Sequence, residues 1–332
     1  MFKDNQKGVV VSVVLPMFNE ESGIQDNLKA LLAVLRKMPC RWELLLVDDG
    51  STDASVKQAK QVLEGEKDAS VISYSPNRGR GFALRRGFEA ARGEYVITTE
   101  SDLSWGADIV YKIYQKLVDS GSDVVVVSPY LKPNGLVGVP LQRRLLSRLG
   151  NKVLTFGLPV KLTMVTGMTR GYKRAMLENI ILQMDGKEIH LEIISKLVGL
   201  GAKFEEIPGV ITWHKKQERV KRKRESKTKR LILSHLYFSI VESPIHFIGL
   251  LGLFFMGFGL MGILAIIVMK IFGFPLLRVP FFPHYVIGSF MAGLVIFIFS
   301  LLSSQITKLE KELMRVYAKM VSFNKTKTDD NH

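Results

Sequence analysis

Short apolar runs alternate with helical patterns along residues 9–128. The runs are rich in β-branched residues and lack polar alternation, which is typical of strands buried on both faces of a parallel sheet. The predicted strands are Val9–Leu15, Glu43–Val47, Ser70–Tyr74, Tyr95–Thr99 and Asp123–Ser128. The predicted helices between them are Ser22–Lys37, Asp53–Leu63, Phe82–Arg92 and Ala107–Asp119. These repeated β–α units predict a doubly wound, Rossmann-like α/β domain.

Two apolar stretches near the C-terminus have a different pattern. Ile245–Val268 and Phe281–Ser304 contain no Asp, Glu, Lys or Arg, and each has 24 residues. About 20 residues of helix span a bilayer core, so we expect a hairpin of two transmembrane helices. The glycines of the first stretch would allow close helix approach or only tune flexibility; they are Gly249, Gly252, Gly257, Gly259 and Gly262.

Two further segments have amphipathic helical patterns. The segment Val139–Phe156 combines an apolar stripe with a basic face. It is expected to lie in a membrane interface or to pack as a surface helix on the core, and the pattern leaves both open. The tail Lys308–Lys327 is also expected to form an amphipathic helix. Assembly into a homo-oligomer and simple membrane contact are both open for this tail.

The charge of the chain is concentrated beside the apolar stretches. The net charge is +15, and residues 215–230 hold ten Lys or Arg and two Glu, a balance of +8. A basic cluster next to a membrane segment attracts anionic headgroups, and no basic platform interleaved with aromatics indicates nucleic-acid binding. The loop between the apolar stretches has only Lys270 and Arg278. Both termini are therefore expected in the cytoplasm by the positive-inside rule.

Cysteine usage and the N-terminus agree with a first domain that stays in the cytoplasm. Cys40 is the only cysteine, which excludes an intrachain disulfide and a cysteine zinc site. The first apolar run is short and ends at Pro16, so we expect no signal peptide.

Polar residues follow the predicted strands at their carboxyl ends, where open α/β sheets bind ligands. Pro16 leads into Asn19-Glu20, and the second strand ends at Asp48-Asp49. The paired carboxylates suit contact with a base or ribose, or capping of the next helix. The turn Asn77–Gly81 combines glycines and arginines before a helix, which suits phosphate oxygens or forms a plain turn.

Glu100 and Asp102 follow the fourth strand, two residues apart. Two carboxylates at this spacing can converge on one hard cation, and Mg²⁺ or Mn²⁺ prefers such oxygen ligands. The alternative is an exposed acidic turn that binds no metal. The pair therefore indicates a candidate metal site for a nucleoside diphosphate.

In this order, the motifs resemble those of family 2 glycosyltransferases with the GT-A fold, and more narrowly the polyprenyl-phosphate sugar transferases such as dolichyl-phosphate mannose synthase. The resemblance runs from about Val11 to Lys227. Its motifs are Pro16-Met17-Phe18-Asn19-Glu20, Val47-Asp48-Asp49-Gly50-Ser51, Asn77-Arg78-Gly79-Arg80-Gly81, Ala91-Arg92-Gly93-Glu94-Tyr95, Arg143 with Ser147, Thr166-Gly167-Met168-Thr169-Arg170-Gly171-Tyr172, Glu192 and Glu225-Ser226-Lys227.

The resemblance implies roles for individual residues. Glu100 and Asp102 are implied as metal ligands and, with Arg143, as catalytic residues. The residues implied for the nucleotide sugar are Pro16, Phe18, Glu20, Asp48, Asp49, Asn77, Arg80 and Ser101. Those implied for an acceptor phosphate are Arg143, Ser147, Arg170, Lys221, Ser226 and Lys227. General attraction of these cations to the bilayer is the alternative.

The chain departs from the family pattern at the metal motif. The family usually has Asp-x-Asp followed two residues later by Gln, whereas here Glu100 replaces the first Asp and Ser104 the Gln. Trp105-Gly106 stands where Pro-Pro is common, and Pro129 where an Arg is often found. These changes bear on metal geometry, sugar preference and the acceptor site.

The expected reaction is inverting transfer of a sugar from a UDP- or GDP-sugar to a polyprenyl phosphate, with Mg²⁺ or Mn²⁺. The alternatives are a glycosyltransferase acting on a hydroxyl of a glycolipid or polysaccharide, and a degenerate membrane scaffold. The expected domains are a cytoplasmic GT-A domain (1–213), a basic juxtamembrane segment (214–244), two transmembrane helices (about 245–270 and 281–304) and a cytoplasmic tail (305–332).

Overall fold

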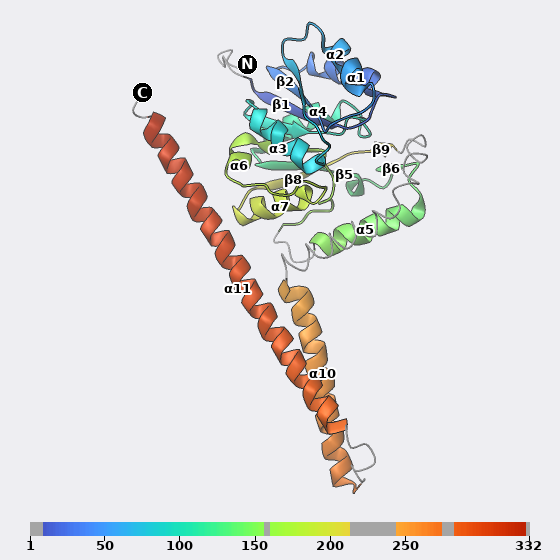
Figure 1. Cartoon of the computed structure of the whole chain (residues 1–332), viewed down its shortest axis with the longest axis vertical. Coiled ribbons are helices and arrows are strands. Elements are labelled where there is room, and N and C mark those ends of the chain that lie inside the picture. The colour runs from blue at the N-terminus through green and yellow to red at the C-terminus, as the bar shows by residue number, and fades with distance from the viewer. Residues whose placement is uncertain (1–8, 156–159, 213–243, 274–281, 330–332) are drawn as a thin grey trace. The chain divides into compact units, whose positions relative to one another are not determined.

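The computed structural model describes residues 9–155, 160–212, 244–273 and 282–329 (Figure 1). These residues form two units, one built on a β-sheet and one on two long helices. Each unit is described by itself.

The predicted alternation of strands and helices is confirmed in the first unit, with element ends shifted by no more than two residues. The strands are β1 (Val11–Met17), β2 (Trp42–Asp48), β3 (Ala69–Ser73), β4 (Tyr95–Thr98) and β5 (Val124–Ser128). The helices are α1 (Ile24–Leu35), α2 (Ser55–Leu63), α3 (Arg80–Ala90) and α4 (Ile109–Ser120). Apolar runs and periodicity were thus sufficient to place these elements.

Several strands and helices follow β5 in the first unit. They are η1 (Pro129–Leu131), β6 (Leu136–Val137), α5 (Leu141–Thr155), β7 (Arg170–Lys173), α6 (Arg174–Glu178), α7 (Ile189–Gly199), β8 (Phe204–Pro208) and β9 (Ile211–Thr212). Helix α5 confirms the amphipathic helix predicted for residues 139–156.

The large sheet has the strand order β3-β2-β1-β4-β7-β5-β8. The expectation of a parallel sheet is correct for β1 to β4 but wrong for β7, which runs antiparallel to both β4 and β5. Strand β7 enters the sheet with Arg170 opposite Thr98. The start of β7 therefore lies beside the end of β4, at the edge where the parallel strands end.

Side chains alternate between the two faces of the sheet, as the period of two requires. Val13 and Leu15 belong to the core shared with α1 and α4. On the other face, α3 packs closely on Val14 and Val47, because a Cβ on Gly87 would lie 2.3 Å from Val14 Cγ1. Both faces are covered by helices (Figure 1), so each strand is buried on both sides.

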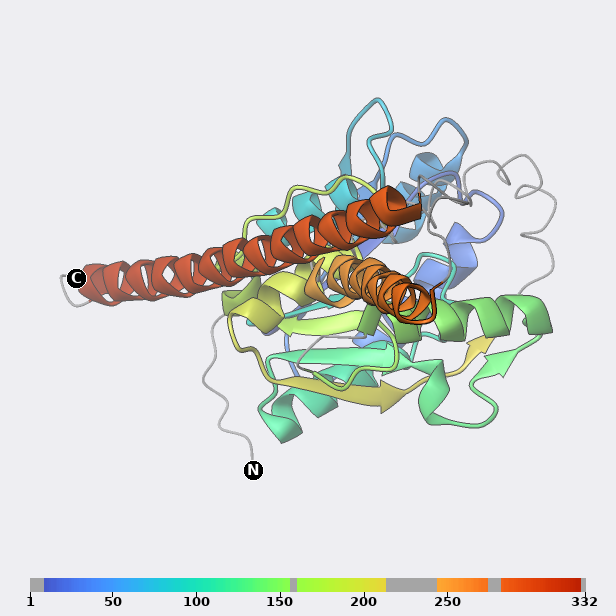
Figure 2. The same ribbon diagram turned by 90° about the horizontal axis from the view of Figure 1, so that it is seen from below.

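The second unit contains α10 (Pro244–Ile271) and α11 (Phe282–Asp329) as far as Leu313; the rest of α11 is grouped with the first unit. Both helices contain a stretch long and apolar enough to cross a membrane, Ile248–Ile271 and Pro283–Ile306. Helix α11 does not end with its apolar stretch; it continues unbroken through the predicted tail (Figure 2).

Glycines bring α10 and α11 into close contact. A Cβ on Gly252 would lie 2.7 Å from the backbone nitrogen of Phe297, and a Cβ on Gly293 would lie 2.5 Å from that of Met256. Gly259 and Gly262 are similarly close to Phe290 and Val286. By contrast, nothing lies within 4 Å of a Cβ on Gly257. Gly252, Gly259 and Gly262 of α10 and Gly293 of α11 thus define one packed face.

Gly252→Ala is expected to destabilise the helix pair, because its methyl group would overlap the backbone of α11. Overpacking of this kind costs about 1–3 kcal/mol. Thermal unfolding of the full chain in mild detergent measures the loss. Gly257→Ala is the matched control in the same helix and should not lower the midpoint. Equal midpoints for the two variants would contradict the packing.

Candidate functional site

The loops that follow β1 and β2 are tied to each other at the carboxyl edge of the sheet. Asn19 donates its backbone N–H to Ser51 Oγ (3.0 Å), and its side-chain oxygen accepts from the Thr52 N–H (2.9 Å). Glu20 N–H donates to Ser55 Oγ (2.7 Å). These reciprocal bonds place Pro16, Phe18 and Glu20 beside the loop that begins at Asp48, as the motif order predicted.

Asp49 organises the third loop of this edge. Its carboxylate is buried and accepts from Tyr74 Oη (2.9 Å), Asn77 Nδ2 (2.8 Å) and the backbone N–H groups of Arg78 (2.8 Å) and Gly79 (3.0 Å). Burial and these bonds raise the pKa of Tyr74, burial contributing most. Asp48 has a smaller set of bonds, since its Oδ1 accepts from the Ser51 N–H (3.0 Å). Asp49 therefore holds the loop, and Asp48 caps its own turn.

The N-terminus of α3 is covered by the chain itself. The Gly81 and Phe82 N–H groups donate to the carbonyl oxygen of Asp185 at 2.7 and 3.3 Å. A Cβ on Gly79 would lie 2.5 Å from this oxygen, so the glycine permits the close approach. A carbonyl oxygen thus occupies the place where the sequence analysis expected a phosphate oxygen.

The segment that covers α3 is residues 181–187, which we call the strap. Arg85 donates to the Asp185 carboxylate and to Leu182 O. At its other side, the buried Glu192 of α7 accepts from the backbone N–H groups of Gln183 and Met184, both at 2.9 Å. Glu192, singled out by the resemblance, therefore anchors the strap.

Glu100 and Asp102 lie immediately after β4, on the same edge. Ser104 Oγ donates to Glu100 Oε2 (3.0 Å), and the Ser104 N–H donates to Asp102 Oδ1 (3.1 Å). The buried Trp105 side chain also donates to Glu100. Ser101 between them is buried, and its carbonyl accepts from Asn27 Nδ2 of α1 (2.9 Å). The two carboxylates are thus held by a tight turn.

The electrostatic setting of Glu100 points to a cation. Burial raises the pKa of Glu100; the nearby Arg80 guanidinium opposes this rise, and the Asp102 carboxylate adds to it. The Arg80 guanidinium thus has Glu100 as an electrostatic partner within the described residues. A positive side chain thus stands beside two carboxylates, where it is available to an anionic ligand.

The donor set fits Mg²⁺ or Mn²⁺. Glu100 and Asp102 supply oxygen ligands only, which hard cations prefer. Across the described ranges no group of three or more His, Cys, Asp or Glu side chains that could hold a metal is found. Two protein carboxylates leave coordination positions for diphosphate oxygens and water, as expected where substrate completes the metal site.

Helix α5 presents Arg143 and a row of leucines to the surface. Arg143 is exposed, and Leu141, Leu145 and Leu149 are 58–67% exposed at a spacing of four residues. Ser147 shares a hydrogen bond of 2.6 Å with the Tyr130 hydroxyl. A helix with exposed leucines and basic residues is typical of one that lies in a membrane interface.

Arg170 lies in a different environment from Arg143. It is fully buried at the start of β7, where it donates to the carbonyl oxygens of His190 (2.9 Å) and Val165. Burial lowers the pKa of its guanidinium. Its bonds to backbone carbonyls make Arg170 a support of the loop before β7. The other acceptor residues, Lys221, Ser226 and Lys227, lie outside the described residues.

Sequence reasoning missed two groups at this site. In the sequence, Trp105 was noted only as a departure from the family pattern, although its indole N–H is a donor that a buried carboxylate needs. Tyr74 directly follows β3 and donates to Asp49, but a single tyrosine after a strand does not indicate such a role in the sequence. The strap was also missed, because its contacts depend on the tertiary fold.

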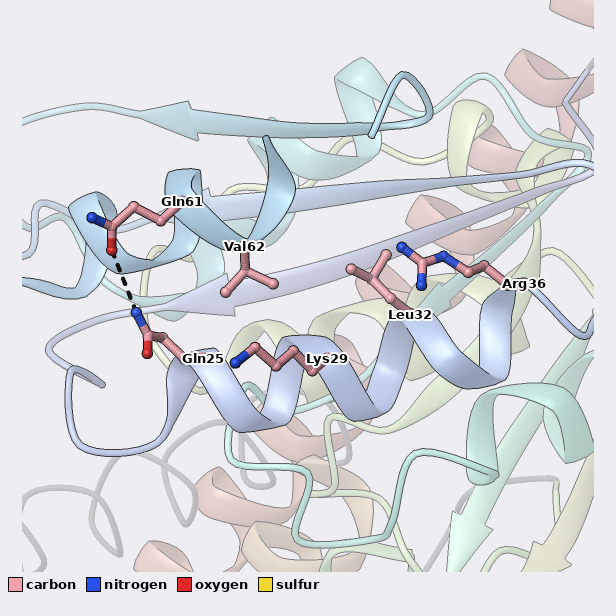
Figure 3. A pocket seen from close by; sticks show the side chains of 6 residues that line it. All are labelled: Gln25, Lys29, Leu32, Arg36, Gln61 and Val62. Carbon is pink, nitrogen blue, oxygen red and sulfur yellow. Dashed lines mark hydrogen bonds between the residues drawn. The ribbon is translucent and has the colours of Figure 1, made fainter. Parts of the chain in front are cut away.

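A separate depression of about 370 Å³ lies between α1 and α2 (Figure 3). Gln25 Nε2 donates to Gln61 Oε1 across it (3.4 Å), and Lys29 and Arg36 lie along the same side. Its lining contains neither Glu100 nor Asp102. It is therefore distinct from the strand-end site.

Comparisons with known proteins agree with this geometry. The profile of glycosyl transferase family 2 matches residues 12–181. A dodecaprenyl-phosphate galacturonate synthase of Rhizobium johnstonii is 28% identical over 276 residues, covering 82% of this chain and 78% of the relative. A dolichol-phosphate mannosyltransferase of Pyrococcus furiosus is 26% identical over 201 residues, covering 60% of this chain and 55% of the relative. The chain thus spans about half the length of the second relative.

A solved structure confirms the fold. Glucosyl-3-phosphoglycerate synthase from Mycobacterium tuberculosis, in complex with Mn²⁺, UDP-glucose and phosphoglyceric acid, matches with a TM-score of 0.50 at 19% identity. The match covers 70% of this chain and 80% of the synthase. The expected GT-A fold is confirmed by this likeness.

Asp49→Asn is expected to destabilise the domain and weaken nucleotide binding. An amide offers one acceptor atom in place of two, so either Asn77 Nδ2 or the Arg78 N–H loses its side-chain acceptor, at a cost of about 1–3 kcal/mol. Thermal unfolding and calorimetric titration with UDP and GDP measure both effects. Asp119→Asn, at an exposed position of α4, is the control and should leave both unchanged. An unaltered midpoint in Asp49→Asn would contradict the role given to this carboxylate.

Proposed function

The chain belongs to glycosyl transferase family 2, and we propose that it moves a sugar from a UDP- or GDP-sugar to a polyprenyl phosphate with inversion. The product is a polyprenyl-phosphate-linked sugar. The observation that carries this proposal is the pair Glu100 and Asp102 beside Arg80, at the edge where the parallel strands end. Two relatives named for transfer to prenyl phosphates support the acceptor class.

The donor would bind across the ends of β1, β2 and β4. Asp48 and Asp49 stand where a base and ribose would contact the β2 loop, with Pro16, Phe18 and Glu20 on the neighbouring loop. Asn77 and Ser101 belong to the same edge. Arg80, whose guanidinium lies near Glu100, is the cation placed to face the diphosphate.

Glu100 and Asp102 would hold Mg²⁺ or Mn²⁺. When bound, such an ion neutralises charge that develops on a nucleoside-diphosphate leaving group. Ser104 and Trp105 orient the longer glutamate arm toward this position through their hydrogen bonds to its carboxylate. Glu100, which replaces the usual Asp of the family, is thus restricted by hydrogen bonds from Ser104 and Trp105.

The acceptor side would be formed around α5. A phosphate oxygen of the lipid attacks the anomeric carbon as the bond from that carbon to the diphosphate breaks, which inverts the configuration. This nucleophile is anionic at neutral pH, so no strong general base is required. Arg143 would bind the lipid phosphate, with Ser147 one turn away on the same helix. Catalysis then depends on positioning and charge stabilisation.

The membrane arrangement follows from the helices and the charges. We place the catalytic domain (1–213), the basic segment (214–244) and the tail (305–332) on the cytoplasmic side, with two spans at about 245–270 and 281–304. The exposed leucines of α5 would enter the interface, where Lys221, Ser226 and Lys227 of the basic segment would approach the phosphate.

Nucleoside-diphosphate release tests the reaction. The purified full chain with Mn²⁺ is incubated with a panel of UDP- and GDP-sugars, with and without polyprenyl phosphate. Release should require one donor and the lipid phosphate, and Asp102→Asn should lower it by at least about a hundredfold. Asp119→Asn is the control. Absence of lipid-dependent release from every donor would favour a hydroxyl acceptor or a scaffold, and donor binding without turnover would support the scaffold.

Arg143→Ala should raise the KM for polyprenyl phosphate and leave the affinity for the donor unchanged. Loss of a charge-assisted contact costs about 1.5–3 kcal/mol, which corresponds to a roughly 10- to 150-fold change. Initial rates over a range of lipid concentrations in mixed micelles provide the measurement. Lys152→Ala removes an exposed cation from the last turn of the same helix and serves as the control. Equal KM values for the two variants would show that α5 affects lipid binding only through its overall positive charge.

A further inference from the structure

One apolar stripe runs along α11 and past the end of its membrane stretch. Its residues recur at alternating steps of three and four, which is the a and d spacing of a heptad repeat. They are Phe299, Leu302, Ile306, Leu309, Leu313, Val316, Met320 and Phe323. All eight positions over four heptads are apolar. A repeat sustained this far is the pattern of a coiled-coil seam.

The stripe faces outward wherever the structure describes its side chains. The first six residues, Phe299 to Val316, are 53–70% exposed. The apolar membrane stretch ends at Ile306. From Leu309 onward the stripe therefore leaves the bilayer core and would meet water or headgroups. Burying these leucines would remove apolar surface from water, so a cover for the stripe is strongly favoured.

The charges along α11 are arranged around this stripe. The positions opposite the seam, c and f of the heptad, are Lys308, Lys311, Arg315, Ala318, Ser322 and Lys325. The next a position after the seam is Lys327, so the apolar repeat ends there. Cations thus occupy most of the c and f positions and the end of the seam, and the b positions are Thr307, Met314 and Val321.

The flanking e and g positions suit a parallel copy. In a parallel pair, each g position faces the e position five residues later on the partner helix. These pairs are Gln305 with Glu310, Glu312 with Tyr317, and Lys319 with Asn324. None of the three pairs joins like charges. Two copies whose hairpins cross the same membrane also send α11 out on the same side, so the parallel orientation is the one available.

We propose that residues 306–323 of α11 form a parallel coiled coil with the same segment of further copies of this chain. The inference rests on the membrane-spanning hairpin of the proposed function but not on the transfer reaction. Of the two roles left open for the tail, assembly and membrane contact, the proposal selects assembly through a defined seam. Because the seam continues into Phe299 and Leu302, the contact would begin inside the membrane and extend beyond it.

Disulfide trapping tests the seam in the full chain. Cys40→Ser gives a cysteine-free background. Leu309→Cys or Leu313→Cys is then introduced on the seam, and Lys311→Cys on the opposite face. Each variant is oxidised in native membranes. The seam variants should lose monomer to a disulfide-linked dimer, since parallel a and d positions bring Cβ atoms together, and Lys311→Cys should stay monomeric. Cross-linking of all three alike, or of none, would overturn the proposal.

Mass measurement in nanodiscs provides the second arm. The wild-type chain should be dimeric or larger. Leu309→Lys with Leu313→Lys should yield monomers, because losing these leucines weakens association by at least about a hundredfold. Ala318→Lys, at an f position, is the matched control and should keep the wild-type mass. A monomeric wild type, or an oligomer unaffected by the double substitution, would overturn the seam. Neither readout uses transferase activity, so a failed transfer assay would leave this test intact.

Discussion

The hydrogen bonds to the buried Asp49 carboxylate hold together the strand-end edge of the sheet, which we call the donor edge because the sugar donor is proposed to bind there. An ionised carboxylate is costly to bury unless donors surround it. Here the donors are two backbone N–H groups, an amide and a phenol, and all of them come from the β3–α3 connection. Satisfying one charge therefore sets the path of the loop that leads to Arg80. The loop after β2 is in turn tied to the loop after β1, so three strand ends form one connected edge.

Two carboxylate environments on this edge lead to two roles. Asp49 accepts from four donor groups, so it holds the loop that borders the proposed nucleotide site. Glu100 has only Ser104 and Trp105 as donors within the described residues, with Asp102 as a like charge beside it. Burial and this like charge favour its protonated form, and a bound cation would reverse that preference. The electrostatic need of this pair is thus a structural reason for a metal, separate from any likeness to other proteins.

The sequence was sufficient to predict the elements that follow simple periodicity and insufficient for those defined by tertiary contact. Strands β1 to β5 are apolar runs, and α5 has a clear stripe. Strand β7 has only four residues, two of them charged and one glycine, so no pattern identifies it. Arg170 was expected near a lipid phosphate because motif matching gives no burial. The role of Glu192 required the strap, whose backbone N–H groups carry no sequence signature. Residue identity indicated which chemistry was present, and the fold decided which atoms were available for it.

The reversed direction of β7 separates the two halves of the site along the chain. Because β7 starts beside the end of β4, residues 129–169 reach the donor edge from outside the β–α units that build it. Apart from the strap, the loops of the proposed donor site are encoded before residue 106, and the proposed acceptor side after residue 128. Acceptor preference can therefore drift by substitution within one contiguous segment while the nucleotide-binding loops stay under their own constraints. Because the two sides of the site are encoded by separate stretches of chain, each can change in evolution without changing the other.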